Sequence, residues 1–191
     1  MSTIVVVRKD KQACIAADTL TSFGDVKLGA TYDRYHDKIQ ICGDSYVGIV
    51  GSAAHSLVVE NIFDEADIDY DLSSRQGIFR TFLKLHGILK EKYFLNVNGK
   101  NENDEPYETS HIDAVIANRH GIFAVYGLRD TNEFERFWAI GSGADFALGA
   151  MYALYDRLDS AEEIAKAGVI AGAEFNNATA LPMTFKTIDL E

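Results

Sequence analysis

Residues 1–18, MSTIVVVRKDKQACIAAD, decide the fold. Two runs in this stretch favour β-strands, and the turn pair Asp10-Lys11 separates them. A two-residue loop of this kind predicts an antiparallel hairpin in which Thr3 lies opposite Asp18. The Asp18 carboxylate is therefore expected within roughly 5 to 8 Å of the first residues of the chain, the reach of cross-strand neighbours.

Ser2 is the candidate nucleophile beside this carboxylate. A small second residue permits removal of Met1, after which Ser2 carries both a hydroxyl and a free α-amine. An α-amine titrates near pH 7.7 to 8.0, so the nucleophile would have its own base attached. The structural alternative is that Ser2 is only an ordinary small residue after an initiator methionine.

A second hairpin is predicted over residues 38–51, KIQICGDSYVGIVG. The turn pair Gly43-Asp44 sets Ile39 opposite Gly48. Lys38 and the Gly48 amide then lie at the same end of this hairpin. The sequence thus predicts one cation and one backbone donor close together.

Length and charge restrict the class of protein. The chain has 191 residues, 47% of them hydrophobic, which suits a single domain with one core. Its 29 acidic and 18 basic residues give a net charge of -11, which argues against nucleic acid and anionic membrane surfaces as partners.

No cofactor, metal or export signal is expected from the sequence. The five histidines lack metal-ligand spacing, and there is no nucleotide-binding glycine loop. The chain has no apolar run of about 18 residues and no signal-peptide pattern, so a cytoplasmic location is predicted. Cys14 and Cys42 both fall in strand-like runs and are predicted to be buried free thiols.

The rest of the chain predicts an α+β fold. A turn-rich connection over 19–37 and an exposed loop over 96–110 are expected. The predicted elements are a helix after Ser52, a helix capped by Ser73 or Ser74, strands 112–118 and 122–127 about a His120-Gly121 turn, a strand 135–140, a helix from Ala144 or Asp145 to about 157, a helix from the Ser160 cap to about 174, and a strand 184–189. This order fits two antiparallel sheets packed face to face with helices outside.

Five short motifs carry a resemblance to a known family. They are Ser2-Thr3-Ile4-Val5, Ala17-Asp18, Lys38-Ile39, Gly48-Ile49-Val50-Gly51-Ser52 and Ile140-Gly141-Ser142-Gly143. In this order and spacing they resemble proteasome β-type subunits, the N-terminal nucleophile peptidases, and within them the HslV-like branch with the HslV-derived proteasome homologues of betaproteobacteria. The resemblance implies a four-layer αββα sandwich and one proteasome β-subunit-like domain over residues 2–191, with Met1 removed.

The resemblance also implies a reaction. Ser2 would form an acyl-enzyme with a peptide, and its α-amine, through a water, would accept the hydroxyl proton. Lys38 would lower the pKa of that amine, and Asp18 would orient Lys38. The Gly48 amide would donate to the oxyanion. Each of these residues also has a purely structural interpretation when it is considered alone. Asp18 would be a turn residue at the end of a strand, Lys38 a solvated charge and Gly48 a residue that eases strand packing.

Further site residues are carried over from the same family. Ser142 would support the α-amine, although Gly141-Ser142-Gly143 also reads as a simple helix-start turn. Family active sites use an aspartate near the C-terminus, and Glu174 is the candidate for its replacement in this chain. The alternative is that Glu174 is a surface residue of the last helix. The predicted specificity pocket, suited to neutral or aromatic side chains, comprises Thr21, His36, Tyr46 and Val50. The chain departs from many relatives in having Ser2 in place of threonine.

The implied partners are polypeptide substrates and other copies of the chain. Family members form double rings, so two rings of six or seven subunits are expected, and the sequence leaves open whether an ATP-dependent unfoldase takes part. Two other functions compete with a peptidase. One is a non-peptidase amidase of the same class, and the other is a catalytically silent structural ring subunit.

Overall fold

The computed structural model describes residues 2–64, 68–96 and 107–191. The elements along these ranges are β1 (Ile4–Lys9), β2 (Gln12–Asp18), β3 (Thr21–Phe23), β4 (Val26–Leu28), β5 (Ile39–Cys42), β6 (Ser45–Val50), α1 (Ala53–Asp64), α2 (Arg75–Lys92), β7 (Asp113–Asn118), β8 (Gly121–Val125), β9 (Thr131–Phe134), β10 (Phe137–Ile140), α3 (Ala144–Leu154), α4 (Ala161–Phe175) and β11 (Met183–Asp189). The predicted order of strands, two helices, strands, two helices and a strand is confirmed. Most of the predicted exposed loop over 96–110 lies outside the described residues.

Two antiparallel sheets form the centre of the fold. Their strand orders are β10-β1-β2-β11 and β5-β6-β7-β8-β9. The first predicted hairpin is confirmed, with Ile4 paired to Ala17. The second is confirmed as well, with Ile39 paired to Gly48. Each two-residue turn fixes the register of its hairpin, which brings Asp18 to the beginning of the chain.

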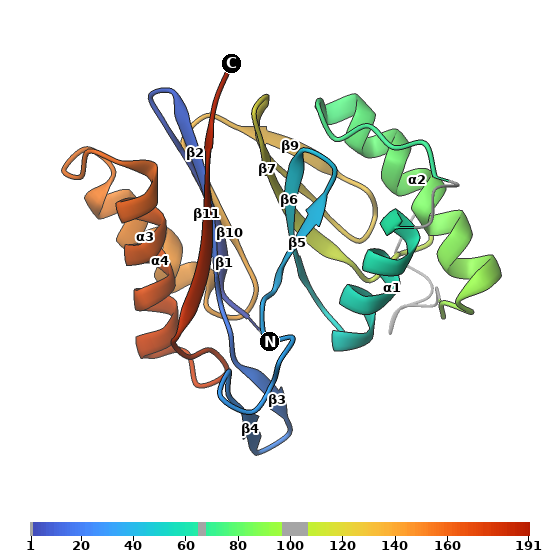
Figure 1. The fold of residues 1–191 in the computed structure, drawn as a ribbon, viewed down its shortest axis with the longest axis horizontal. Coiled ribbons are helices and arrows are strands. Elements are labelled where there is room, and N and C mark those ends of the chain that lie inside the picture. The colour runs from blue at the N-terminus through green and yellow to red at the C-terminus, as the bar shows by residue number, and fades with distance from the viewer. Residues whose placement is uncertain (1, 65–67, 97–106) are drawn as a thin grey trace.

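Four layers are visible edge on in Figure 1, with α3 and α4 over the first sheet and α1 and α2 over the second. Apolar clusters hold the layers together, one between the sheets and one beneath each helix pair. The cluster between the sheets contains Ile4 and Ile15 from one sheet and Val115 and Ile122 from the other. This arrangement confirms the predicted αββα sandwich. The first residues of the chain lie at one end of it, beside the β3–β4 hairpin (Figure 1).

Residues 131–140 form two strands where the sequence predicted one. Thr131–Phe134 is the edge strand β9 of the second sheet, and Phe137–Ile140 crosses to pair with β1 in the first. An edge strand buries few side chains, and β9 consists mostly of polar residues, so no apolar alternation marked it. The hydrophobic pattern of the sequence also gives no sign that the chain crosses from one sheet to the other between β9 and β10.

Three smaller predictions were wrong at their boundaries. The β7–β8 turn is Arg119-His120, where the His120 amide donates to the Asn118 side chain at 2.9 Å. Helix α3 ends at Leu154, not near residue 157. After it the chain makes a tighter turn, in which the Arg157 amide donates to the Leu154 carbonyl oxygen at 2.9 Å. Within the predicted loop 19–37, β3 and β4 pair in a short hairpin.

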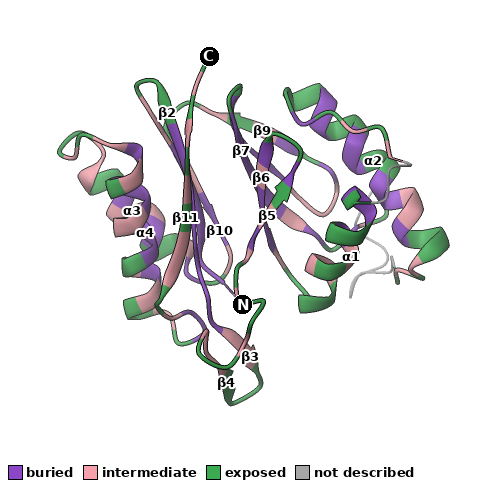
Figure 2. Ribbon diagram, in the orientation of Figure 1, coloured by how far each residue is buried: buried purple, intermediate pink, exposed green. Residues whose placement is uncertain are grey.

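The predicted caps and thiols agree with the structure. Ser74 caps α2 by accepting from the Gly77 amide at 3.1 Å, and Ser160 caps α4 by accepting from the Glu163 amide at 3.1 Å. The Glu163 carboxylate accepts from the Ser160 hydroxyl at 3.0 Å, not from the Ser160 amide as in a full capping box. Figure 2 shows buried residues along the strands and exposed ones on the outer faces of the helices. Cys14 and Cys42 are free and buried, and burial raises the pKa of both thiols to about 12. Among the helices in the described ranges, none has the length and apolar character needed to cross a membrane.

Candidate active site

The Asp18 carboxylate is fully buried at the end of β2 and surrounded by donors. Its Oδ1 accepts from the Thr3 amide at 2.8 Å and from Lys38 Nζ at 2.9 Å. Its Oδ2 accepts from the amides of Leu20 at 3.0 Å and Ala180 at 3.3 Å. A buried charge is tolerated only when it is compensated in this way. The Asp18 carboxylate is thus held against the amide of Thr3, the residue that follows Ser2.

Lys38 lies just before β5 and reaches into this cluster. Its Nζ donates to Asp18 Oδ1 and to the Leu20 carbonyl oxygen at 2.7 Å, and only 14% of its side chain is exposed. Burial lowers the pKa of Lys38, while the neighbouring Asp18 carboxylate opposes that shift. The prediction that Asp18 and Lys38 converge beside the start of the chain agrees with this geometry.

Ser2 is separated from β1 by Thr3 and is 6% exposed. Its carbonyl oxygen accepts from the Gly143 amide at 3.3 Å. Gly141 has a φ of +95°, and a Cβ atom there would lie 2.1 Å from the same carbonyl oxygen. Only glycine allows this approach. The turn that contains Ser142 therefore packs against Ser2.

Ser142 is paired with Asn176 and not with Glu174. The Ser142 hydroxyl donates to Asn176 Oδ1 at 3.1 Å, and Asn176 Nδ2 donates to the Ser142 carbonyl oxygen at 2.8 Å. Glu174 is exposed near the end of α4 and forms no ion pair with any residue that the structure describes. Sequence reasoning missed Asn176, although it belongs to the segment in which the family aspartate was sought.

Gly48 is buried within the fold. A Cβ atom there would lie 2.7 Å from Ile4 Cγ2, so glycine is required for the sheets to pack. Hydrogen-bonded and non-hydrogen-bonded residue pairs alternate along an antiparallel pair of strands. The pair next to the β5–β6 turn, Cys42–Ser45, is hydrogen-bonded, so Ile39–Gly48, three pairs further on, is a non-hydrogen-bonded pair. The Gly48 peptide therefore points toward β7, where Val115 is its partner. This register weighs against the predicted role of its amide as an oxyanion donor.

Gly51 is a second glycine of the same motif that sequence reasoning did not single out. Gly51 comes directly after the last residue of β6. This end of β6 lies toward Ser2, since Gly48 in the second half of the strand packs on Ile4 at the start of β1. Gly51 is exposed with a φ of +130°, and a Cβ atom there would lie 3.0 Å from the His111 carbonyl oxygen. Within the described ranges, its amide has no backbone hydrogen-bond partner.

The predicted specificity residues fall into two groups. Thr21 begins β3, directly after the residue whose carbonyl oxygen accepts from Lys38, and the His36 ring bonds a loop carbonyl oxygen at 2.8 Å. Tyr46 and Val50 are partly buried and pack against the cluster between the sheets. The structure thus brings Thr21 near the Asp18 cluster but directs Tyr46 and Val50 into the core.

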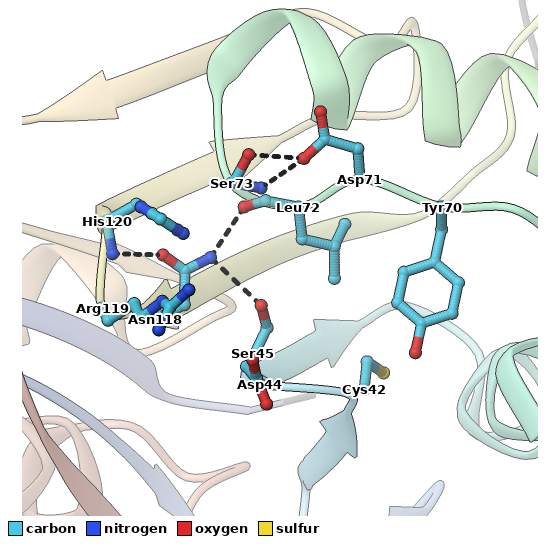
Figure 3. A pocket seen from close by; sticks show the side chains of 10 residues that line it. All are labelled: Cys42, Asp44, Ser45, Tyr70, Asp71, Leu72, Ser73, Asn118, Arg119 and His120. Carbon is cyan, nitrogen blue, oxygen red and sulfur yellow. Dashed lines mark hydrogen bonds between the residues drawn. The ribbon is translucent and has the colours of Figure 1, made fainter.

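A pocket of about 160 Å³ lies at the other end of the second sheet (Figure 3). Its lining residues are Cys42, Asp44, Ser45, Tyr70, Asp71, Leu72, Ser73, Asn118, Arg119 and His120. Asn118 Nδ2 donates to Ser45 Oγ at 3.1 Å and to the Leu72 carbonyl oxygen at 2.7 Å. Ser45 begins β6 and Gly51 follows it, so the whole strand separates this pocket from the Ser2 end. The described residues contain no group of three or more histidine, cysteine or acidic side chains arranged to hold a metal.

Comparison with known proteins gives close structural relatives. No known family profile matches the sequence, and no curated protein sequence matches it. Two structures of Thiobacillus denitrificans BPH, one alone and one in complex with epoxomicin, are 43% identical with a TM-score of 0.91. They cover 99% of this chain, and it covers 98% and 99% of theirs. Eukaryotic HslV from Trypanosoma brucei is 19% identical over 98% of this chain and 99% of its own, with a TM-score of 0.67, a likeness of fold.

The αββα sandwich matches the fold of these HslV-like and proteasome-type structures. BPH is an HslV-derived proteasome homologue, and its identity and coverage are high enough to establish kinship. The chain belongs to the proteasome β-type subunit family, in its HslV-like branch. The resemblance inferred from the five motifs is thereby confirmed.

Proposed function

We propose that the chain hydrolyses peptide bonds with Ser2 as an N-terminal nucleophile, after removal of Met1. One observation carries this proposal. The buried Asp18 carboxylate accepts both from Lys38 Nζ and from the amide that directly follows Ser2. A fixed ion pair beside a serine at the start of a strand gives a free α-amine a defined electrostatic environment. Kinship with proteasome-type peptidases supports the same reaction class.

In the proposed reaction the Ser2 hydroxyl attacks the peptide carbonyl carbon. Its proton passes through a bridging water to the Ser2 α-amine, and from there to the departing amine as the carbon–nitrogen bond breaks. The resulting ester is hydrolysed by water, with the α-amine again as base. Lys38 keeps the local potential positive and lowers the pKa of that amine, and Asp18 holds Lys38 in place.

The oxyanion needs a backbone donor at the Ser2 end of β6. The sequence prediction assigned it to Gly48, but the sheet register directs that amide toward Val115. We therefore assign the donor to Gly51, whose exposed backbone follows β6. Loss of one such donor typically costs about 2.7 to 4 kcal/mol of transition-state stabilisation.

The proposed substrates are polypeptides with neutral or aromatic side chains before the cleaved bond. Thr21 supports this part of the proposal, because it directly follows Leu20, whose carbonyl oxygen accepts from Lys38 Nζ, and His36 remains a prediction. Tyr46 and Val50 remain predictions, as do a cytoplasmic location and an unfoldase partner.

Self-assembly into a double ring of six- or seven-membered rings is part of the proposal. Large apolar side chains are exposed on both helical layers: Leu57, Phe79 and Leu83 on one, and Phe146, Tyr152, Ile170 and Phe175 on the other. Exposed apolar surface of this extent supports contacts between copies. A stable monomer in light scattering at micromolar concentration would contradict the assembly.

Epoxomicin provides the test of the nucleophile. It is a peptide epoxyketone, and its six-membered adduct requires both the hydroxyl and the free amine of one residue. Intact-mass and peptide mapping should place one adduct on Ser2 in Met1-processed protein and none in Ser2→Ala. The same adduct on Ser2→Ala, or none on processed protein, would contradict the proposal and favour a silent ring subunit. Cleavage of small amides but not of peptides would favour the amidase alternative.

A further inference from the structure

The side chain of Asn176 is held by three hydrogen bonds beside the proposed nucleophile. Asn176 is the C-cap of α4, and its own amide donates to the Gly172 carbonyl oxygen at 3.0 Å. Its Oδ1 accepts from the Ala178 amide at 3.0 Å and from the Ser142 hydroxyl at 3.1 Å. Its Nδ2 donates to the Ser142 carbonyl oxygen at 2.8 Å. Asn176 thus clamps the turn that contains Ser142 to the end of α4.

Two backbone groups determine which way this amide side chain faces. A backbone N–H can only donate, so the atom next to Ala178 must be the side-chain oxygen. A backbone carbonyl can only accept, so the atom next to the Ser142 carbonyl oxygen must be the nitrogen. The Ser142 hydroxyl faces Oδ1 and must donate to it. Its hydrogen is therefore committed to Asn176.

The direction of that hydrogen decides what Ser142 offers to Ser2. With the hydrogen turned toward Asn176, the oxygen of Ser142 has lone pairs left to accept. The same turn is held against Ser2, because the Gly143 amide donates to the Ser2 carbonyl oxygen at 3.3 Å. The Ser142 oxygen is thus fixed as an acceptor within a turn that is bonded to the Ser2 backbone.

We propose that Asn176 is a positioning residue that fixes the Ser142 hydroxyl as a hydrogen-bond acceptor for the Ser2 α-amine. This inference rests on the proposed function. Asn176 orients Ser142 without adding a charge. A carboxylate at this position would favour the protonated amine and raise its pKa. The neutral amide therefore keeps the amine available as a base at lower pH.

The experiment measures kcat and KM against pH for a fluorogenic peptide, using the assembled protein. Asn176→Ala should lower kcat about tenfold with KM within about twofold, the loss expected from one oriented hydrogen bond. In a Ser142→Ala background, Asn176→Ala should cause no further loss beyond about twofold, because both act through one hydroxyl. The exposed neighbour provides the control, and Asn177→Ala should match wild type.

Asn176→Asp gives a readout that a purely structural role would not change. The variant keeps an oxygen for the Ser142 hydroxyl and the Ala178 amide, loses the Nδ2 donor to the Ser142 carbonyl oxygen and adds a charge. The added charge should move the acid limb of the kcat profile up by about 0.5 to 1 pH unit. This readout remains available if Asn176→Ala fails to assemble.

If Ser2→Ala is inactive, as the proposed function requires, either of two results would overturn the inference about Asn176. They are an unshifted acid limb in Asn176→Asp, and losses that add fully in the double variant with Ser142→Ala. Peptide cleavage retained by Ser2→Ala would instead overturn the proposed function, and with it the role of Asn176.

Discussion

The two ends of the sandwich hold their polar groups in different ways. At the end where the chain begins, one fully buried carboxylate, Asp18, binds three backbone amides and Lys38 Nζ. At the opposite end, beside a pocket of about 160 Å³, the Asn118 side chain donates to Ser45 Oγ and to the Leu72 carbonyl oxygen. The polar groups at the pocket end therefore join neighbouring elements, whereas the proposed chemistry lies where Asp18, Lys38 and Ser2 converge.

The largest expected effect comes from comparing two serine variants, one at each end of the sandwich. Ser2→Ala should abolish peptide cleavage, with a fall of about 10³-fold or more, because it removes the nucleophile. Ser45→Ala, which removes the acceptor of Asn118 Nδ2 at the pocket end, should keep kcat within about twofold per folded site. Steady-state kinetics on assembled protein gives both values, and equal losses would erase the proposed distinction between the ends.

A pair of lysines makes the next comparison. Lys38→Ala should lower kcat about 10²-fold without disturbing assembly, since its proposed role is to tune the amine. Lys9 is also partly buried, but it donates to the carbonyl oxygens of Tyr155 and Leu158 at the far end of β1. Lys9→Ala should reduce stability and leave kcat unchanged. Light scattering and kinetics on both variants check this, and a Lys38→Ala protein as active as wild type would refute the assigned role.

Asn118 should affect stability and not activity. Asn118→Ala leaves the Leu72 carbonyl oxygen and the His120 amide without their partners, so unfolding should become easier by about 2 kcal/mol. The value of kcat per folded site should stay at the wild-type level. Denaturant unfolding gives the first quantity, with Asn177→Ala as an exposed control. Lost turnover at unchanged stability would mean that the pocket end takes part in catalysis.

The smallest expected effect is a pH dependence of stability at the Ser2 end. Burial lowers the pKa of Lys38 below the 10.5 of an exposed lysine, so the unfolded chain binds the proton more tightly than the folded one. Stability relative to Lys38→Met should therefore rise as the pH rises toward 10.5, by at most about 1.4 kcal/mol per pH unit. Denaturant unfolding between pH 7 and 10 measures the trend. A falling difference would place the Lys38 pKa above its usual value.

Much of the site could be predicted because two short turns set it. The Asp10-Lys11 turn fixes the pairing that puts Asp18 beside Thr3, and their hydrogen bond of 2.8 Å follows from that register. The Gly43-Asp44 turn places Lys38 in the same way. Local rules are sufficient here, since neighbours in a hairpin are also close in sequence.

The parts that were missed depend on contacts between distant segments. Asn176 meets Ser142 across 34 positions, through the loop that ends α4, and nothing in the pattern of residues 172–177 indicates which side chain turns inward. The direction of the Gly48 amide depends on β7 as well as on its own hairpin. The mostly polar strand β9 had no apolar alternation to reveal it.

The most direct test of the central claim compares processed protein with a stably N-terminally extended form. An added residue converts the Ser2 α-amine into an amide without a basic lone pair, whereas a hydrolase with a separate side-chain base would keep its base. Both forms should be verified by intact mass and by light scattering before their rates are compared. We predict that the extended protein cleaves a fluorogenic peptide as slowly as Ser2→Ala. Cleavage by the extended protein at the processed rate would contradict this prediction.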